Sequence, residues 1–80
     1  MKNIDKLKKA FTEALNLPAD SEIEGLTYNS IPEWDSLAHM ALISHLDEAF
    51  DIMIDTEDII ELSSFEKAKQ ILAKYGVEFE

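Results

Sequence analysis

Apolar side chains recur every three or four residues near the start of the chain, a spacing that predicts an amphipathic helix. This helix runs from about Asn3, a suitable cap, to Leu15. Asn16 and Pro18 end it, because proline pushes the preceding residue away from helical backbone angles. Its inward stripe consists of Ile4, Leu7, Phe11, Ala14 and Leu15.

A long connection over residues 16–34 follows, punctuated by turn-forming residues. A loop of this length is unusual in a small domain and is often functional. Its scattered apolar side chains would fasten it to the helices: Ile23, Leu26, Tyr28, Ile31 and Trp34. We expect Trp34 to pack in the core, because aromatic rings dominate small cores, with an exposed ligand contact as the alternative.

The longest helix is predicted from Ser36 to about Asp51, with Asp35 as its N-cap. One face is apolar and suits the core: Leu42, Ile43, Leu46, Ala49 and Phe50. A second face is also apolar in its first half and polar further along: Leu37, Met40, Ala41, Ser44, His45 and Glu48. A helix that is apolar on two sides must bury both or expose one. Either the long loop covers Leu37 and Met40, or this face stays open.

Two more helices complete the pattern. A short one over about residues 56–61, with acids in its first turn, would bring three apolar residues to the core: Ile59, Ile60 and Leu62. The last helix has capping-box spacing at Ser63 and Glu66 and ends near Tyr75, where Gly76 is a fitting stop. Its inward residues are Phe65, Ala68, Ile71, Leu72 and Tyr75, and residues 77–80 form a tail.

These elements predict an all-α fold, a small four-helix bundle with three main helices, one short helix and a long loop between the first two. Eighty residues support one domain, over residues 1–80. No apolar run approaches membrane-spanning length, and residues 1–5 carry no signal-peptide apolar region. The chain has no cysteine, which excludes disulfides and thiolate chemistry. We therefore expect a cytoplasmic protein.

Charge narrows the class of partner. The formal net charge is −10, and all seven bases are lysines within residues 2–9 and 67–74. Nucleic acid and anionic membranes are disfavoured as partners, whereas basic patches on other proteins are favoured. The alternative is an acidic surface that serves solubility alone.

Ser36 is the main candidate for chemistry. The start of a helix carries partial positive charge and unpaired donors, so Ser36 is either a capping residue or an attachment point for an anionic group. A hydrolase nucleophile is not expected, since no Gly-x-Ser-x-Gly elbow surrounds it. His39 either flanks an attached phosphate or is solvated, and His45 faces outward. The acids between Asp47 and Asp58 lack EF-hand spacing, so we expect weak, nonspecific divalent binding and no dedicated metal site.

The stretch Trp34-Asp35-Ser36-Leu37-Ala38-His39-Met40, followed by Leu46-Asp47-Glu48-Ala49-Phe50-Asp51 and Ile54, resembles the acyl carrier protein family and its peptidyl and aminoacyl relatives. The resemblance covers essentially the whole chain. It implies that a phosphopantetheinyl transferase attaches phosphopantetheine, donated by coenzyme A, to Ser36 within an Asp35-Ser36-Leu37 motif. The arm would hold an acyl or aminoacyl group as a thioester for enzymes of a fatty-acid, polyketide or other specialised biosynthetic pathway. The protein itself would catalyse nothing.

The resemblance also implies a monomer whose open face is read by loading and downstream enzymes with basic docking patches. That docking surface would comprise Met40, Ala41, Ser44 and Glu48, beside Leu37. Fatty-acid carriers usually have an acid in place of Ala41, so the form here is more like free-standing carriers of specialised pathways. The core would open to shelter part of an acyl chain: Phe11, Leu42, Ile43, Leu46, Phe50, Ile54, Ile59, Ile71 and Leu72.

Two other functions stay open. One is an unmodified acidic helical interaction module that binds a basic partner through Leu37 and Met40. The other is a small metal-binding or buffering protein that uses the acids of residues 47–58.

Overall fold

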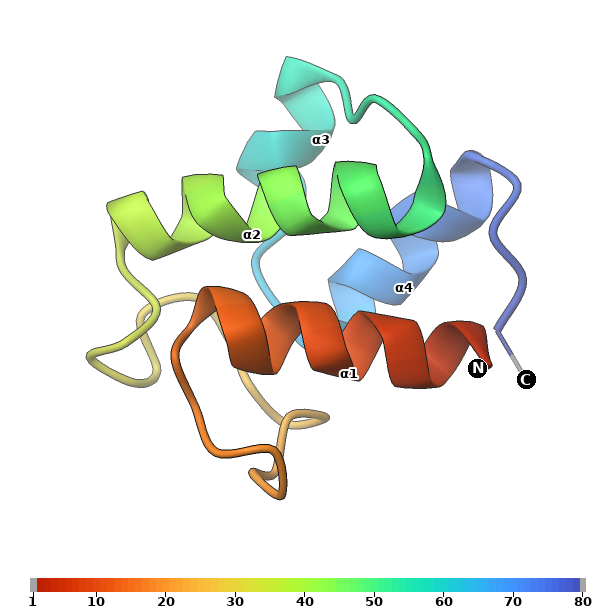
Figure 1. The fold of residues 1–80 in the computed structure, drawn as a ribbon. Helices are drawn as coiled ribbons and strands as arrows, with labels where there is room; N and C mark the ends of the chain where they lie inside the picture. Colours follow the sequence, from red (N-terminus) through yellow and green to blue (C-terminus); the bar gives the residue numbers. More distant parts are fainter. Residues whose placement is uncertain (1, 80) are drawn as a thin grey trace.

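Four α-helices form within residues 2–79, the part of the chain that the computed structural model describes (Figure 1). They are α1 (Asn3–Ala14), α2 (Ser36–Phe50), α3 (Thr56–Glu61) and α4 (Phe65–Lys74). In Figure 1, α1 and α2 run side by side across the front, and α4 lies behind them. The predicted all-α bundle, with one short helix and a long first loop, is confirmed.

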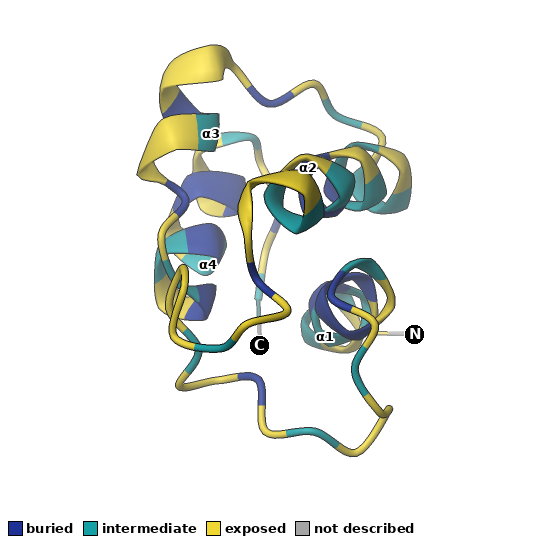
Figure 2. Cartoon of the chain, turned by 90° about the vertical axis from the view of Figure 1, so that its left-hand side faces the viewer, coloured by how far each residue is buried: buried dark blue, intermediate teal, exposed yellow. Residues whose placement is uncertain are grey.

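The core lies where α1, α2 and α4 face one another, and Figure 2 shows buried positions on their inner sides. Trp34 is fully buried at the end of the long loop, so its expected packing role is confirmed. The Phe11 ring makes edge contacts with Trp34 at 5.4 Å and with Phe65 at 5.2 Å between ring centroids. Leucines fill the space around these rings: Leu7, Leu15, Leu42, Leu46, Leu62 and Leu72. Aromatic and leucine packing therefore holds the loop against the helices.

Two helix starts, those of α1 and α4, differ from the expected caps, whereas the expected stop after α4 is present. Lys2, not Asn3, occupies the N-cap position of α1, and the Asn3 side chain instead donates to the Glu78 carbonyl at 2.9 Å. The expected Ser63–Glu66 capping box is wrong by one residue, because Ser64 caps α4 by accepting from the Lys67 amide. Gly76 adopts a φ of +90° after α4, as its role as a stop requires.

Ile60 does not reach the core. Its side chain is 77% exposed, whereas Leu62 is buried and Ile59 is half-buried, so the expected inward position of Ile60 is wrong. A helix as short as α3 presents few positions to the core, and its remaining apolar side chain faces water. Phe50 and Ala49 are also only half-buried. In the tail, Val77 is buried and the Phe79 ring meets Phe50 at 6.2 Å; Glu80 lies outside the described residues.

The long loop is fastened near its middle by backbone pairing. Thr27 forms an isolated antiparallel bridge with Ser64, where the chain passes from α3 to α4. The Tyr28 amide donates to the Ser63 carbonyl at 2.7 Å, and the Phe65 amide donates to the Leu26 carbonyl at 3.1 Å. This pairing holds in place the loop segment that contains Tyr28, whose side chain reaches the start of α2.

Candidate functional site

Ser36 occupies the first position of α2 and is exposed. The preceding residue, Asp35, has extended backbone angles, and its side chain accepts from the Ala38 amide at 2.9 Å. This is the expected N-cap, an interaction that typically stabilises a helix by about 1 kcal/mol. The cap turns the chain sharply into the helix, so the Ser36 hydroxyl stands at the positive end of the helix dipole, open to solvent.

Tyr28 reaches the same point from the long loop. Its hydroxyl lies 3.1 Å from Ser36 Oγ, and either oxygen can be the donor. The pairing with Ser63 and Ser64 holds the Tyr28 backbone, and its ring makes an edge contact with the Trp34 ring at 6.1 Å. Nothing in the spacing of the sequence connects Tyr28 with Ser36, and only the fold of the loop brings them together.

His39 links three parts of the molecule. Trp34 Nε1 donates to His39 Nδ1 at 3.1 Å, and His39 Nε2 lies 2.8 Å from the Ile59 carbonyl oxygen. Because an indole N–H can only donate, Nδ1 is the acceptor and Nε2 carries the proton that the Ile59 carbonyl accepts. The expectation of a solvated His39 is therefore wrong: the ring is half-buried and ties the long loop, α2 and α3 together. Both ring nitrogens are occupied away from Ser36, which leaves the serine without a base from this residue.

The predicted docking residues share the face of α2 that points away from the core. Leu37 is 83% exposed and Met40 is 54% exposed, so the long loop does not cover them. Ser44 and Glu48 are exposed one and two turns further on, and Ala41 is half-buried at the edge of this face. The outward face of α2 therefore combines an apolar first half, beside Ser36, with a polar second half.

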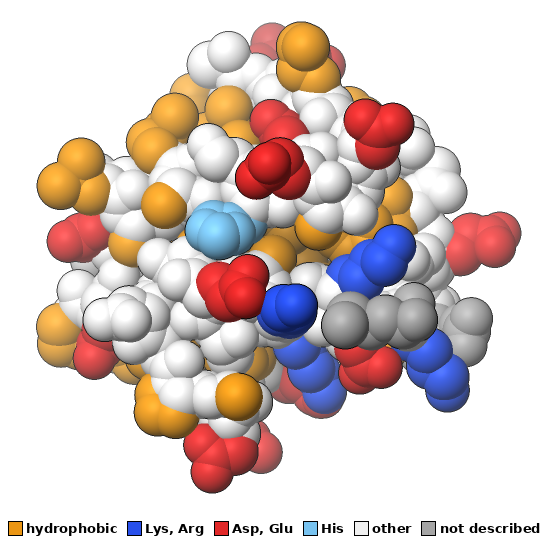
Figure 3. Space-filling model, in the orientation of Figure 1, with side chains coloured by type: hydrophobic (Ala, Val, Ile, Leu, Met, Phe, Trp, Pro, Cys, Tyr) orange, Lys and Arg blue, Asp and Glu red, His pale blue; other side chains and the backbone are white. Residues whose placement is uncertain are grey.

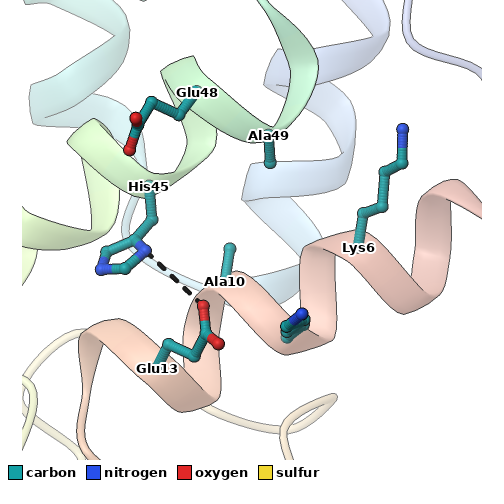
Figure 4. A pocket seen from close by; sticks show the side chains of 7 residues that line it. Lys6, Ala10, Glu13, His45, Glu48 and Ala49 are labelled. Carbon is teal, nitrogen blue, oxygen red and sulfur yellow. Dashed lines mark ion pairs between the residues drawn. The ribbon is translucent and has the colours of Figure 1, made fainter.

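A shallow groove of about 350 Å³ runs between α1 and α2 (Figure 4). Glu13 of α1 and His45 of α2 face each other across it, with 3.9 Å between His45 Nδ1 and Glu13 Oε1. The sequence predicts that His45 faces outward, whereas its side chain is half-buried beside α1. Glu48 and Lys6 also line the groove. Figure 3 shows acidic side chains over α2 and lysines over α1 on this side of the molecule. The charges around the groove are of both signs, which favours no one class of ligand.

Asp58 is the buried charge that sequence reasoning missed. Its carboxylate accepts from Lys74 Nζ and from the Tyr75 hydroxyl, both at 2.7 Å, and the same hydroxyl accepts from the Asp55 amide at 2.9 Å. The hydrogen bond from Lys74, followed by that from Tyr75, lowers the pKa of Asp58 below its ordinary value of 3.8. These contacts join the start of α3 to the end of α4, so Asp58 has a structural role.

The acids of residues 47–58 do not converge. Among residues 2–79, no group of three or more histidine, aspartate or glutamate side chains is arranged to hold a metal ion. Asp47 accepts from the Ile54 amide at 3.1 Å, and Asp58 is bound by Lys74 and Tyr75. Two of the acids therefore serve hydrogen bonds within the fold, and the others lie apart along the surface.

The chain matches no protein-family model, no curated protein and no solved structure. Within the described residues, no helix is both long enough and apolar enough to cross a membrane. The arguments about function below therefore rest on the residues and their geometry.

Proposed function

We propose that this chain is a carrier protein that holds an acyl or aminoacyl group on a phosphopantetheine arm attached to Ser36. The observation that carries the proposal is the position of Ser36: an exposed hydroxyl at a capped helix start, beside an apolar face that the core does not use. A serine that served only to cap a helix would be the N-cap itself, but Asp35 already fills that role.

The surroundings of Ser36 fit a phosphodiester. The group is anionic, and it would lie at the N-terminal end of α2, where the helix dipole favours negative charge. The Tyr28 hydroxyl at 3.1 Å adds a hydrogen-bond donor. Between residues 10 and 66 every full charge is negative. The helix start and the Tyr28 hydroxyl are therefore the groups near Ser36 that would stabilise the charge of the phosphodiester. The arm, when attached, supplies a thiol that forms the thioester with the cargo.

Attachment requires a separate transferase. Ser36 Oγ would form a bond to the phosphorus that bears pantetheine in coenzyme A, and the phosphoanhydride bond would break. The adenosine bisphosphate half of coenzyme A leaves, and the hydroxyl proton goes to a base of the transferase. His39 would not be that base, since both of its ring nitrogens are engaged with Trp34 and Ile59.

The outward face of α2 would position the carrier on its enzymes. Leu37 and Met40 offer exposed apolar contacts next to Ser36, and Glu48 adds a charge further along the helix. With a net charge of −10, the carrier is attracted to basic patches, which raises the rate of encounter. The cargo and the pathway, fatty-acid, polyketide or another, are set by those enzymes.

The same exposed face favours one alternative, an unmodified acidic module that binds a basic protein through Leu37 and Met40. In that function Ser36 would have no role beyond the helix start. The two functions differ in one chemical event, the modification of Ser36.

Mass spectrometry of the intact protein separates them. Incubation with coenzyme A, magnesium and a phosphopantetheinyl transferase of broad specificity should raise the mass by one phosphopantetheine group. Ser36→Ala should abolish the gain. Ser21→Ala removes a serine of the long loop, outside the predicted docking surface, and should leave the gain complete. No gain on the wild-type protein with several transferases would favour the unmodified module.

A further inference from the structure

The sulfur-containing side chains of the described residues lie outside the core. The chain has no cysteine, and Met40 and Met53 are the two methionines within residues 2–79. Met40 is 54% exposed and Met53 is 82% exposed, whereas the buried hydrophobic residues of this part of the chain are all of other types. Methionine is flexible and often fills gaps in a core. Here its sulfur chemistry is separated from the packing of the fold.

Met40 differs from Met53 in its surroundings. It follows Ser36 by four residues and Leu37 by three along α2, and side chains at these spacings share one face of a helix. Leu37 is 83% exposed, so the two side chains form an apolar surface directly beside the exposed Ser36. Met53 lies beyond the other end of α2, which is about 20 Å long at 1.5 Å per residue. Of the two, Met40 alone has its sulfur next to the proposed attachment point.

We propose that Met40 is a reversible oxidation site, at which a peroxide converts the thioether to a sulfoxide and thereby weakens the docking of partner enzymes at Ser36. The inference rests on the proposed function and goes beyond it by adding a means of regulation. The oxidant belongs to the class of small peroxides, of which hydrogen peroxide is the simplest. A carrier regulated in this way would be loaded more slowly when peroxide is abundant.

The step needs no other group of the chain. The Met40 sulfur attacks one oxygen of hydrogen peroxide, a sulfur–oxygen bond forms, and the oxygen–oxygen bond breaks. The thioether gives up two electrons and becomes the sulfoxide, while the other oxygen leaves with both hydrogens as water. A methionine sulfoxide reductase reverses the change with two thiols, which become a disulfide as the sulfoxide oxygen leaves as water. The exposure of Met40 admits both the peroxide and the reductase.

The sulfoxide changes the character of the docking surface. A thioether is apolar and adapts its shape to a partner, whereas a sulfoxide is polar and carries an oxygen that accepts hydrogen bonds from water. Burying that oxygen against an apolar partner without a hydrogen bond costs free energy. Leu37 and Met40 supply the exposed apolar contacts next to Ser36, so oxidation alters one of the two.

Oxidation at Met40 should leave the fold intact. The buried residues of α2 are Leu42, Ile43 and Leu46. More than half of Met40 is already exposed to water, so its sulfoxide oxygen can point to solvent without disturbing them. The thermal midpoint should therefore stay close to that of the untreated protein. Weaker docking by an intact fold is what separates regulation from oxidative damage.

The rate of arm attachment before and after oxidation tests this inference. The protein without the arm is treated with hydrogen peroxide, the peroxide is removed with catalase, and a peptide digest locates each added oxygen by mass. The transferase reaction with coenzyme A is then followed as the initial rate of mass gain. Oxidation at Met40 should slow this rate at least threefold. Methionine sulfoxide reductases that act on both epimers should restore the untreated rate.

Two matched variants assign the effect to one sulfur. Met40→Leu keeps an apolar side chain of similar size that peroxide does not oxidise, so its treated and untreated rates should agree. Met53→Leu makes the same change beyond the far end of α2. Its untreated rate should equal that of the wild-type protein, and peroxide should slow it by the same factor. Circular dichroism melts of the treated proteins measure the fold separately.

The outcomes are distinct. An unchanged rate after complete oxidation of Met40 would overturn this inference and leave the carrier function standing. Equal slowing of Met40→Leu and wild type by peroxide would place the effect at another residue and also overturn it. A fall in the thermal midpoint that accompanies the slower rate would mean damage to the fold, not weaker docking. No mass gain in the untreated protein would overturn the carrier function and this inference with it.

Discussion

The helices α1 and α2 lie against each other and are of similar length, yet they use their apolar residues differently. The large apolar residues of α1 lie on one side, where Leu7 and Phe11 are fully buried and Ile4 is half-buried. In α2, Leu42 and Leu46 are fully buried, but Leu37 is 83% exposed on the opposite face. The core accounts for the apolar pattern of α1 completely and for that of α2 only in part.

The comparison separates the apolar side chains that stabilise the fold from those that do not. Apolar side chains stabilise a small domain only where they leave water, so exposed ones at the start of α2 add nothing to folding. They adjoin Ser36, whose hydroxyl is likewise exposed. Folding gives no account of the outward face of α2, and this face adjoins Ser36, which is why we propose a function for it.

The largest expected effect is in the core that both helices share. Phe11→Ala removes a ring that contacts Trp34 and Phe65, and it should destabilise the protein by about 3–5 kcal/mol. Urea denaturation followed by circular dichroism measures this loss. A change below about 1 kcal/mol, well short of the usual cost of a core aromatic, would contradict the central place of Phe11.

A smaller effect should follow from Asp58, which anchors α3 to α4 independently of α2. Because contacts with Lys74 and Tyr75 lower the pKa of Asp58, its stabilising effect is full above the ordinary pKa of 3.8. That effect is lost as the pH falls through the lower pKa of the folded state. Asp58→Asn should lower the thermal midpoint at neutral pH and flatten the acid limb of its pH dependence.

Thermal melts across the acid range compare the two proteins. Asp20→Asn, which removes one exposed acid from the long loop, is the control for net charge and should follow the wild-type profile. If the thermal midpoints of wild type and Asp58→Asn changed in parallel with pH, the link between α3 and α4 would not depend on the ionised carboxylate of Asp58.

The smallest change in stability should come from the outward face of α2. Leu37→Ala should alter the free energy of unfolding by less than about 0.5 kcal/mol, as surface substitutions usually do. Leu46→Ala makes the same chemical change on the buried face and should cost about 2–5 kcal/mol. Despite its normal stability, Leu37→Ala should slow the transferase reaction several-fold, measured as the initial rate of mass gain. Equal destabilisation by the two variants would erase the distinction between the faces.

The parts of the fold that sequence predicted are those set by local chemistry. Helix spacing, the Asp35 cap and the Gly76 stop depend on neighbours along the chain, and the structure contains all three. Local chemistry was also misleading where two similar residues compete: Ser63 and Ser64 both suit a cap, and the pairing with Thr27 leaves Ser64 in that position.

The parts that sequence did not predict depend on distant contacts. The partners of His39 are Trp34 and the backbone of Ile59, which no local pattern associates with it. In the sequence, Asp58 is one acid among several. Only the fold places Lys74 and Tyr75, at the end of α4, within hydrogen-bond distance of its carboxylate. Pairs of positions that change together among related sequences are the kind of signal that finds such contacts.

The pairing of Thr27 with Ser64 divides the long loop into a segment that tolerates changes of length and one that does not. Residues 18–22 precede the pairing and are mostly exposed, so an insertion there enlarges a surface excursion at a small entropic cost. Successive side chains of a paired segment point to opposite sides, so one extra residue between Thr27 and Tyr28 would turn the phenol away from Ser36. Insertional scanning of this loop would therefore reveal a tolerant half and an intolerant half, with the boundary at a single backbone bridge.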